Sequence, residues 1–132
     1  MELELIYTER RRDRLGFENL TPPQKVLLLI ASTHGLVGNG GFEYLFQHKV
    51  DIEGIAAAYE AINLPEAAQI MKQVAREFPP NSVDHDARLQ YVKSNKSKFM
   101  DFSRKMWELA DATDHQLGAY VEAHDTDFTK YE

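Results

Sequence analysis

The sequence predicts an all-α protein that folds as a single compact domain of six or seven helices. Apolar residues recur at spacings of three and four along most of the chain, which is the period of an amphipathic helix. No segment alternates between polar and apolar residues with the period of two that is typical of a strand. The length of 132 residues suits one domain with a core of its own.

The chain is predicted to begin with an N-terminal segment, residues 1–20, ahead of a helical domain over residues 21–132. The segment is expected to hold a short helix, over residues 3–15, that packs on the domain. Its arginine-rich stretch RRRDR, residues 10–14, is short and carries no interleaved aromatic residues. It therefore does not predict direct binding to nucleic acid.

A long apolar helix is expected to open the domain. Thr21 is a favourable N-cap, Pro22 suits the first helical position, and Gln24 completes a capping box. Residues 26–30 are apolar on every side, which predicts a central and buried helix. Gly38 is expected to lie just beyond its last turn, where glycine commonly ends a helix.

Three helices are predicted in the middle of the chain. A short one covers residues 42–48. Asp51 is expected to cap the next helix, and Pro65 to start the third. The sequence FPPN, residues 78–81, should end that helix, because the residue before a proline is pushed out of helical space.

Three further helices are predicted toward the carboxyl end. Two of them cover residues 84–93 and residues 96–111, with apolar residues at helical spacing. Thr113 and Gln116 form a second capping-box pattern, which predicts the start of the last helix.

The segment GNGG, which starts at Gly38, predicts a bend between two helices. It matches neither the phosphate loop of nucleotide hydrolases nor the dinucleotide-binding pattern. Gly38 and Gly40 accept positive φ without strain, and Asn39 or Gly41 is expected to cap the helix that follows. Gly41 would also allow two helices to approach closely. The alternative is that backbone amides at the new helix start bind an anion, with Lys49 as the only base nearby.

The negative charge of the protein is concentrated at the carboxyl end. The formal net charge is −6, and residues 1–107 carry as many acids as bases. Residues 108–132 carry seven acids against one base, Lys130. Carboxylates three or four residues apart on a helix lie about 5–6 Å apart at Cβ and can imitate the charges of a nucleic-acid backbone. The six acids predicted to bind a partner are Glu108, Asp111, Asp114, Glu122, Asp125 and Asp127.

The positions of these acids relative to helix ends point the same way. Glu108 and Asp111 are expected near the end of one helix, and Asp125 and Asp127 near the end of the next. The helix dipole disfavours negative charge there, so these acids are not expected to stabilise their helices. The alternative is a solvated face that keeps the protein soluble.

Catalysis and metal binding are not predicted. Asp111 and His115 are four residues apart, but they straddle a predicted helix break, and the five histidines do not assemble three or four ligands. There is no Gly-x-Ser-x-Gly pattern and no cysteine, so no nucleophile stands out. We expect no enzyme activity, no metal and no cofactor. The lack of an apolar run near 18 residues and of a secretory signal predicts a cytoplasmic protein without membrane contact.

The motif formed by Asn39, Gly40, Gly41 and Phe42, followed by Phe46, resembles a bacterial family of small helical domains of unknown function. The studied branch of that family is a DNA-mimic protein. The resemblance covers residues 22–128 and implies an all-α fold, a role in binding a protein, and a homodimer.

Residues 56–80 have the layout of the two family helices that follow the motif, with Asn63 in place of the usual glycine. Tyr44 and His48 stand where the family favours glutamine and asparagine, so any role of those two polar side chains is not carried over.

Three hypotheses about function follow. The first is a non-enzymatic domain that presents the acidic C-terminal face to a basic protein, such as a DNA-binding transcription regulator. The second, from a different class, is a small-ligand protein or enzyme that uses a pocket near residues 38–48, with Asn39, Glu43, Tyr44 and His48. The third is a dedicated inhibitor or immunity-type protein. Aromatic residues left over for a homodimer interface are Trp107, Phe128 and Tyr131.

Overall fold

The computed structural model describes residues 1–81 and 84–128, and this part of the chain is all-α, as predicted. It contains seven α-helices, two 3-10 helices and no strand. The elements in chain order are α1 (Glu2–Leu15), η1 (Phe17–Asn19), α2 (Pro22–Leu45), α3 (Ile52–Ala61), α4 (Pro65–Glu77), α5 (His85–Ser94), α6 (Lys96–Glu108), α7 (Ala110–Ala123) and η2 (Asp125–Phe128).

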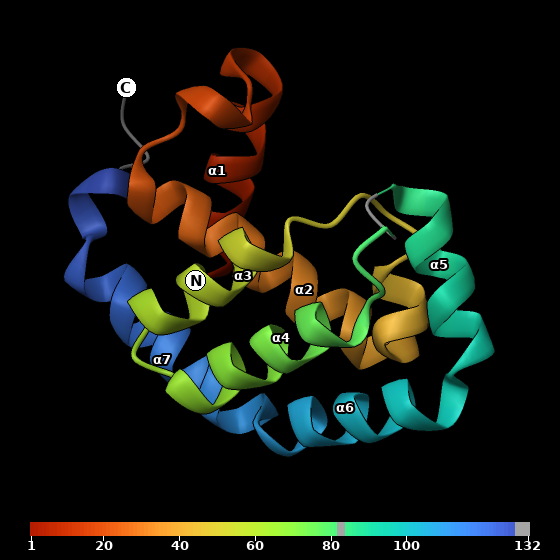
Figure 1. The fold of residues 1–132 in the computed structure, drawn as a ribbon. Coiled ribbons are helices and arrows are strands. Elements are labelled where there is room, and N and C mark those ends of the chain that lie inside the picture. Colours follow the sequence, from red (N-terminus) through yellow and green to blue (C-terminus); the bar gives the residue numbers. More distant parts are fainter. Residues whose placement is uncertain (82–83, 129–132) are drawn as a thin grey trace.

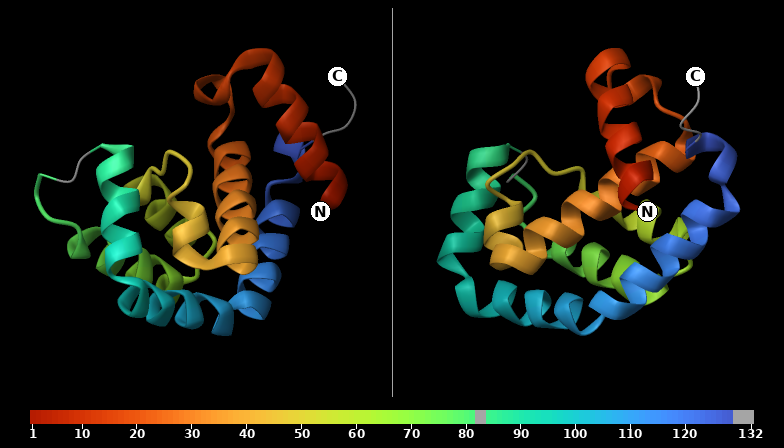
Figure 2. Two further views of the ribbon diagram at one scale, coloured as in Figure 1. Left: turned by 90° about the vertical axis from the view of Figure 1, so that its right-hand side faces the viewer. Right: turned by 180° about the vertical axis from the view of Figure 1, so that it is seen from behind.

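Helix α2 is the centre of the fold. It packs against α3, α6 and α7, and Figure 2 shows it between α3 on one side and α7 on the other. Helices α3 and α4 form an antiparallel pair, while α6 runs along the base of the molecule and leads into α7 (Figure 1). Helix α1 stands at one end, where it contacts α2 and η2.

The start of α2 confirms the predicted capping box and adds a tertiary contact to it. The Gln24 backbone N–H donates to Thr21 Oγ1 at 3.4 Å, and the Thr21 N–H donates to Gln24 Oε1 at 2.9 Å. Gln24 Nε2 also donates to the Asp127 carbonyl oxygen at 2.7 Å. One buried side chain therefore caps α2 and ties it to η2 at the other end of the chain.

For the second and third of the predicted middle helices, the Asp51 cap, the Pro65 start and the end before the prolines are confirmed. Asp51 caps α3 by accepting the Gly54 N–H at 3.0 Å. Pro65 is the first residue of α4, and this helix ends before Phe78, whose backbone is extended. Both features come from interactions within a few residues, which is why the sequence reveals them.

An aromatic cluster joins the end of α2 to α4, α5 and α6. The ring of Phe78 lies 5.1 Å from that of Phe46 and 5.6 Å from that of Phe99. Phe42 meets Phe102 edge-on at 6.5 Å. These separations lie in the range that aromatic pairs favour, and the cluster fixes the residues after the glycine motif against α6.

The bend in α2 lies two residues later than predicted. Gly38 is helical, and the non-helical backbone is at Gly40 (φ −155°) and Gly41 (φ 67°). After the bend, only residues 42–45 continue as helix, so the short helix predicted over residues 42–48 is shorter than expected. The glycine motif is therefore a kink inside one long element and not the end of a helix at Gly38.

The junction between α6 and α7 also differs from the prediction. Helix α6 ends at Glu108 and α7 begins at Ala110, so a single residue, Leu109, separates them. Thr113 lies inside α7, where its hydroxyl donates to the Leu109 carbonyl oxygen at 2.8 Å and caps nothing. The predicted capping box of Thr113 and Gln116 is therefore wrong, because the helix starts three residues before Thr113.

Among the described residues, no helix is long and apolar enough to cross a membrane.

Candidate protein-interaction surface

Helix α7 carries a row of exposed acids that we call the acidic ridge, formed by Asp111, Asp114, Glu122 and the adjacent Asp125 of η2. Asp111 and Glu122 are 11 residues apart, which is three helical turns, so they lie in line about 16 Å apart along the axis. Asp114 lies one turn from Asp111, on a neighbouring row. All four side chains are exposed.

A face of α7 adjacent to the acidic ridge holds the helix on the fold. Thr113, Leu117 and Val121 are buried against the core, at the spacings of four that define one helical face. This packing fixes the rotation of α7 and keeps the acidic ridge turned toward solvent. Gly118 lies within the ridge, and a side chain added there would meet open space.

The other two predicted acids are placed differently. Glu108 is exposed at the last residue of α6, next to the start of α7. Asp127 is only partly exposed, and its charge acts on Tyr120, whose pKa is raised by burial first and by Asp127 second. The structure therefore brings Glu108 to the edge of the acidic ridge and turns Asp127 toward the core.

The chain itself supplies no basic side chain other than histidine along the described part of the ridge. No lysine or arginine follows Lys105 in the described part of the chain. Across from the ridge, His34 Nε2 on α2 lies 3.3 Å from Asp114 Oδ1, an ion pair only when the imidazole is protonated.

Asp111 corrects the argument from helix dipoles. It lies in the first turn of α7 and not at the end of the preceding helix. Negative charge is favoured at a helix N-terminus, so Asp111 stabilises its helix, contrary to the expectation. The dipole argument remains valid for Glu108, at the end of α6, and for Asp125, just past the end of α7.

Asp111 and His115 also share one helix, so the helix break expected between them is absent. They nevertheless belong to no cluster of three or more metal-ligating side chains within residues 1–81 and 84–128.

The kink at Gly40 and Gly41 allows α2 to pack closely against α6. The Phe42 N–H, free at the bend, donates to Ser103 Oγ at 3.0 Å, and the Ser103 hydroxyl donates to the Phe99 carbonyl oxygen at 2.8 Å. A Cβ at Gly41 would lie 2.8 Å from Ser103 Oγ. The expected close approach of two helices at Gly41 is confirmed. The alternative was that backbone amides at this helix start bind an anion, but the Phe42 amide is already hydrogen-bonded to Ser103.

Of the residues in the small-ligand hypothesis, Glu43 and His48 line two different hollows of the described part of the chain. Glu43 lines a cavity of about 90 Å³ next to α6, whereas His48 lines a separate groove on the other side of α2. Asn39 and Tyr44 are exposed. The Tyr44 and His48 rings pack edge-on at 5.8 Å, so these two departures from the family motif contact each other.

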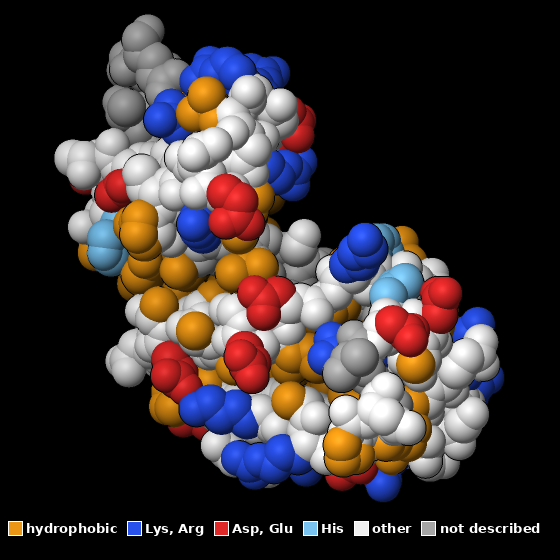
Figure 3. All heavy atoms as spheres, turned by 45° about the horizontal axis from the view of Figure 1, so that its top comes forward, with side chains coloured by type: hydrophobic (Ala, Val, Ile, Leu, Met, Phe, Trp, Pro, Cys, Tyr) orange, Lys and Arg blue, Asp and Glu red, His pale blue; other side chains and the backbone are white. Residues whose placement is uncertain are grey.

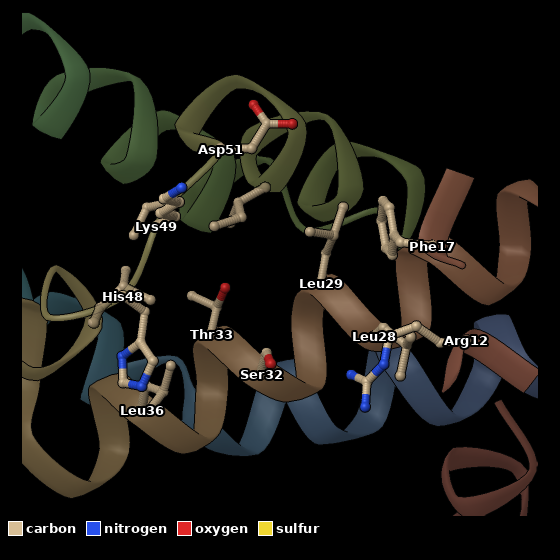
Figure 4. Close-up of a pocket in the computed structure, with 13 residues that line it drawn as sticks. Arg12, Phe17, Leu28, Leu29, Ser32, Thr33, Leu36, His48, Lys49 and Asp51 are labelled. Atoms are coloured by element: carbon tan, nitrogen blue, oxygen red, sulfur yellow. The ribbon is translucent and has the colours of Figure 1, made fainter. Parts of the chain in front are cut away.

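The groove that contains His48 lies on the face of the molecule that Figure 3 shows, where the surface is hollowed. It has a volume of about 300 Å³ and an apolar floor built by one face of α2. Arg12 lies at one end and His48 with Lys49 at the other, with the hydroxyls of Ser32 and Thr33 between (Figure 4).

The aromatic residues expected at a homodimer interface are placed differently. Phe128 is buried at 2% exposure, so it belongs to the core. Trp107 is 40% exposed, but its indole N–H donates to the Val37 carbonyl oxygen at 2.7 Å. Tyr131 lies outside the described residues.

Sequence reasoning missed Ser103 and Tyr59. A signal for Ser103 was available, because it lies among Phe99, Phe102 and Met106 on the apolar face of α6, where a hydroxyl needs a partner. For Tyr59 there was none, because its ring fits an apolar helical face like any core residue.

Comparison with known proteins places the chain in a family. No curated protein and no solved structure gives a significant match to the chain. A family model described as DMP19-like protein matches residues 18–124, which leaves out α1 and η2 and covers helices α2 to α7. The chain therefore belongs to the family of DMP19-like proteins, which confirms the resemblance indicated by the motif at residues 39–42.

Proposed function

We propose that this protein is a non-catalytic interaction domain of the DNA-mimic type, which presents the acidic ridge to the DNA-binding surface of a basic protein. The observation that carries the proposal is the row of exposed carboxylates on one side of α7, with no lysine or arginine among the described residues after Lys105. Family membership supports it, because the DMP19-like family is a DNA-mimic family.

The geometry favours a protein partner with a basic helix or strand. The ridge stands on a helix held by Leu117 and Val121, so its charges are presented without a large loss of backbone entropy on binding. Gly118 in the middle leaves room for a partner side chain. One DNA strand carries one negative charge about every 3.4 Å along the helix axis. The carboxylates of the ridge are more widely spaced, so the ridge imitates part of the charge of one short strand segment.

The binding should depend steeply on salt. Exposed charges are screened beyond about 8–10 Å at physiological ionic strength, and the carboxylates of the ridge are all exposed. The partner should therefore be retained at low salt, released at high salt, and displaced by duplex DNA.

The experiment is a pull-down from a lysate of the host at low and high salt, with the captured proteins identified by mass spectrometry. The charge-reversed variant carries Asp111→Lys, Asp114→Lys and Glu122→Lys. The matched control carries Glu18→Lys, Glu53→Lys and Glu66→Lys, which change the net charge equally at exposed positions outside the ridge.

A DNA-binding protein that is captured by the wild type and the control, lost with the ridge variant and displaced by duplex DNA supports the proposal. Equal capture by both variants contradicts it. A captured enzyme or toxin that duplex DNA does not displace would instead support the dedicated-inhibitor function.

A further inference from the structure

The groove that contains His48 has the features of a binding site that is separate from the acidic ridge. It lies between one face of α2, the end of α1 with η1, and the segment that leads into α3 (Figure 4). We call it the Thr33 groove. Its volume of about 300 Å³ is at the lower end of the range for small-molecule sites.

The hydroxyl of Thr33 is the polar group in the middle of this groove. Buried hydroxyls on helices commonly donate to the carbonyl oxygen one turn earlier, as Thr8, Ser103 and Thr113 do here at 2.7–2.8 Å. Thr33 is 1% exposed, yet its hydroxyl makes no hydrogen bond with a described residue. Its oxygen points into the groove (Figure 4), and it is not sealed from solvent as the hydroxyl of Tyr59 is. Buried polar groups are nearly always paired, so the partner of this hydroxyl must come from the groove, as water or as a ligand atom.

The charged side chains of the groove favour an anion. Lys49 at one end is exposed and makes no ion pair with a described residue, and Arg12 lies at the other end. Asp51 also lines the groove, but its carboxylate is held as the cap of α3, where it accepts the Gly54 N–H. Two bases against one acid leave the lining with a net positive charge, which His48 increases when it is protonated.

The walls of the groove suit an aliphatic chain. Leu29 and Leu36 are seven residues apart on α2, about 10 Å along the helix axis, with Thr33 between them. Val50 and Ile55 add apolar wall from the α3 side. Leu29, Leu36 and Val50 are partly exposed, so a bound chain would cover apolar surface that is now open to water.

We propose that the Thr33 groove binds a medium-chain aliphatic carboxylate. The carboxylate accepts a hydrogen bond from Thr33 and lies at the Lys49 end, because Thr33 is the groove hydroxyl next to that end (Figure 4). The alkyl chain lies along the leucines of α2, toward the apolar stem of Arg12. The proposal does not depend on the acidic ridge or on a macromolecular partner, so the purified protein is enough to test it.

The probe is octanoate, and the compared compounds are hexanoate, acetate and octylamine. Calorimetry or ligand-observed NMR measures their binding at concentrations at which none of them forms micelles. A buried methylene contributes up to about fourfold in affinity, so octanoate should bind about four- to fifteenfold more tightly than hexanoate. Octylamine has the same chain with the opposite charge and should bind at least about threefold more weakly than octanoate.

Two variants test the contacts of the carboxylate. Thr33→Val removes the hydroxyl and should weaken octanoate by about tenfold while the protein stays as stable as the wild type or more stable. Lys49→Gln should weaken octanoate by about two- to fivefold. Their matched controls are Thr126→Val and Lys93→Gln, at exposed positions that do not line the groove, and both should leave the affinity unchanged.

A third variant tests the place of the alkyl chain. Ser32 is exposed and lines the groove, so Ser32→Phe should fill the groove and weaken octanoate by at least about tenfold. Ser97→Phe is its matched control, because Ser97 is also exposed on a helix and does not line the groove.

Millimolar or tighter binding of octanoate with these effects supports the proposal, and no binding of octanoate to the wild type overturns it. Acetate or octylamine that bound as tightly as octanoate would overturn it, because the apolar walls or the charge of the groove would then play no part. An affinity that Thr33→Val left unchanged would also overturn it, because the hydroxyl would then be paired with water and not with the carboxylate. Binding that Ser32→Phe did not weaken would place octanoate outside the groove, with the same consequence.

Discussion

Ser103 caps a helix to which it does not belong: its hydroxyl oxygen accepts the N–H of Phe42 at 3.0 Å, across 61 residues of sequence. The same hydroxyl donates to the Phe99 carbonyl oxygen one turn earlier in α6. Ser103 is 1% exposed and Phe42 is fully buried, so no solvent can replace this contact. The hydroxyl that α6 supplies therefore stabilises the kink at the family motif.

Replacing Ser103 by alanine should destabilise the protein by about 1–3 kcal/mol, because the Phe42 N–H is then buried without a partner. Urea unfolding followed by circular dichroism measures the change. Ser97→Ala is the control, since Ser97 is exposed on the same helix and should change stability by less than about 0.5 kcal/mol. A Ser103→Ala variant as stable as this control would contradict the capping role.

Substitution by alanine should destabilise the protein at Gly41 and stabilise it at Gly38. At Gly41 the backbone has φ 67° and ψ −166°, a region almost restricted to glycine, and a new Cβ would meet Ser103 Oγ at 2.8 Å. We expect Gly41→Ala to cost at least about 1–3 kcal/mol. Gly38 is helical with open space at its Cβ, so Gly38→Ala should stabilise by about 0.5–1 kcal/mol.

Unfolding midpoints of these two alanine variants test where the motif bends. If Gly38→Ala were the more damaging change, the bend would lie at Gly38, as the sequence alone suggests.

The contrast between these glycines shows which features could be predicted from sequence. The caps at Thr21 and Asp51 and the start at Pro65 depend on atoms within four residues, and all three predictions are confirmed. The position of the kink depends on Ser103, 61 residues away, and no local pattern identifies that partner.

The arrangement of the candidate site could likewise be predicted only in part from the sequence. Counting charges was enough to find the acids of the carboxyl end. Their arrangement depends on where α7 begins. The prediction placed this start at Thr113, whereas Leu109 ends α6 and α7 follows at once. An error of a few residues put Asp111 at the wrong end of a helix and reversed the sign of its interaction with the dipole.

Tyr59 should make the protein sensitive to alkali. Burial raises the pKa of its hydroxyl well above the ordinary value near 10. Above about pH 10 the unfolded chain loses this proton and the folded chain keeps it, so stability falls as pH rises, by up to about 1.4 kcal/mol per pH unit. Below about pH 10 the residue adds no pH dependence.

Urea midpoints of the wild type and of Tyr59→Phe between about pH 8 and pH 11 measure this effect. Tyr59→Phe should be as stable as the wild type or more stable near neutral pH, because it removes an unpaired buried hydroxyl. It should also lose less stability in alkali. Tyr44→Phe, at an exposed ring, is the control. Parallel alkaline curves for the wild type and Tyr59→Phe would show that this hydroxyl ionises equally in both states.

Asp111 and Glu122 should differ in their effect on stability although they share the acidic ridge. Asp111 lies in the first turn of α7, where the partial positive charge of the helix end favours a carboxylate. Glu122 lies in the last turn, where the dipole disfavours one. Asp111→Asn should therefore cost about 0.3–1 kcal/mol, and Glu122→Gln should be neutral or slightly stabilising.

Thermal and urea unfolding at low ionic strength resolve the difference, which added salt should reduce because both side chains are exposed. Both substitutions remove one charge from the ridge, so both should lower the affinity for the proposed partner to a similar extent. If Asp111→Asn weakened partner binding and Glu122→Gln did not, binding would change in step with the stability of the protein. The ridge would then act through the fold of α7 and not through its charge. Equal weakening with unequal stability would separate the charge of the ridge from the stability of the helix that carries it.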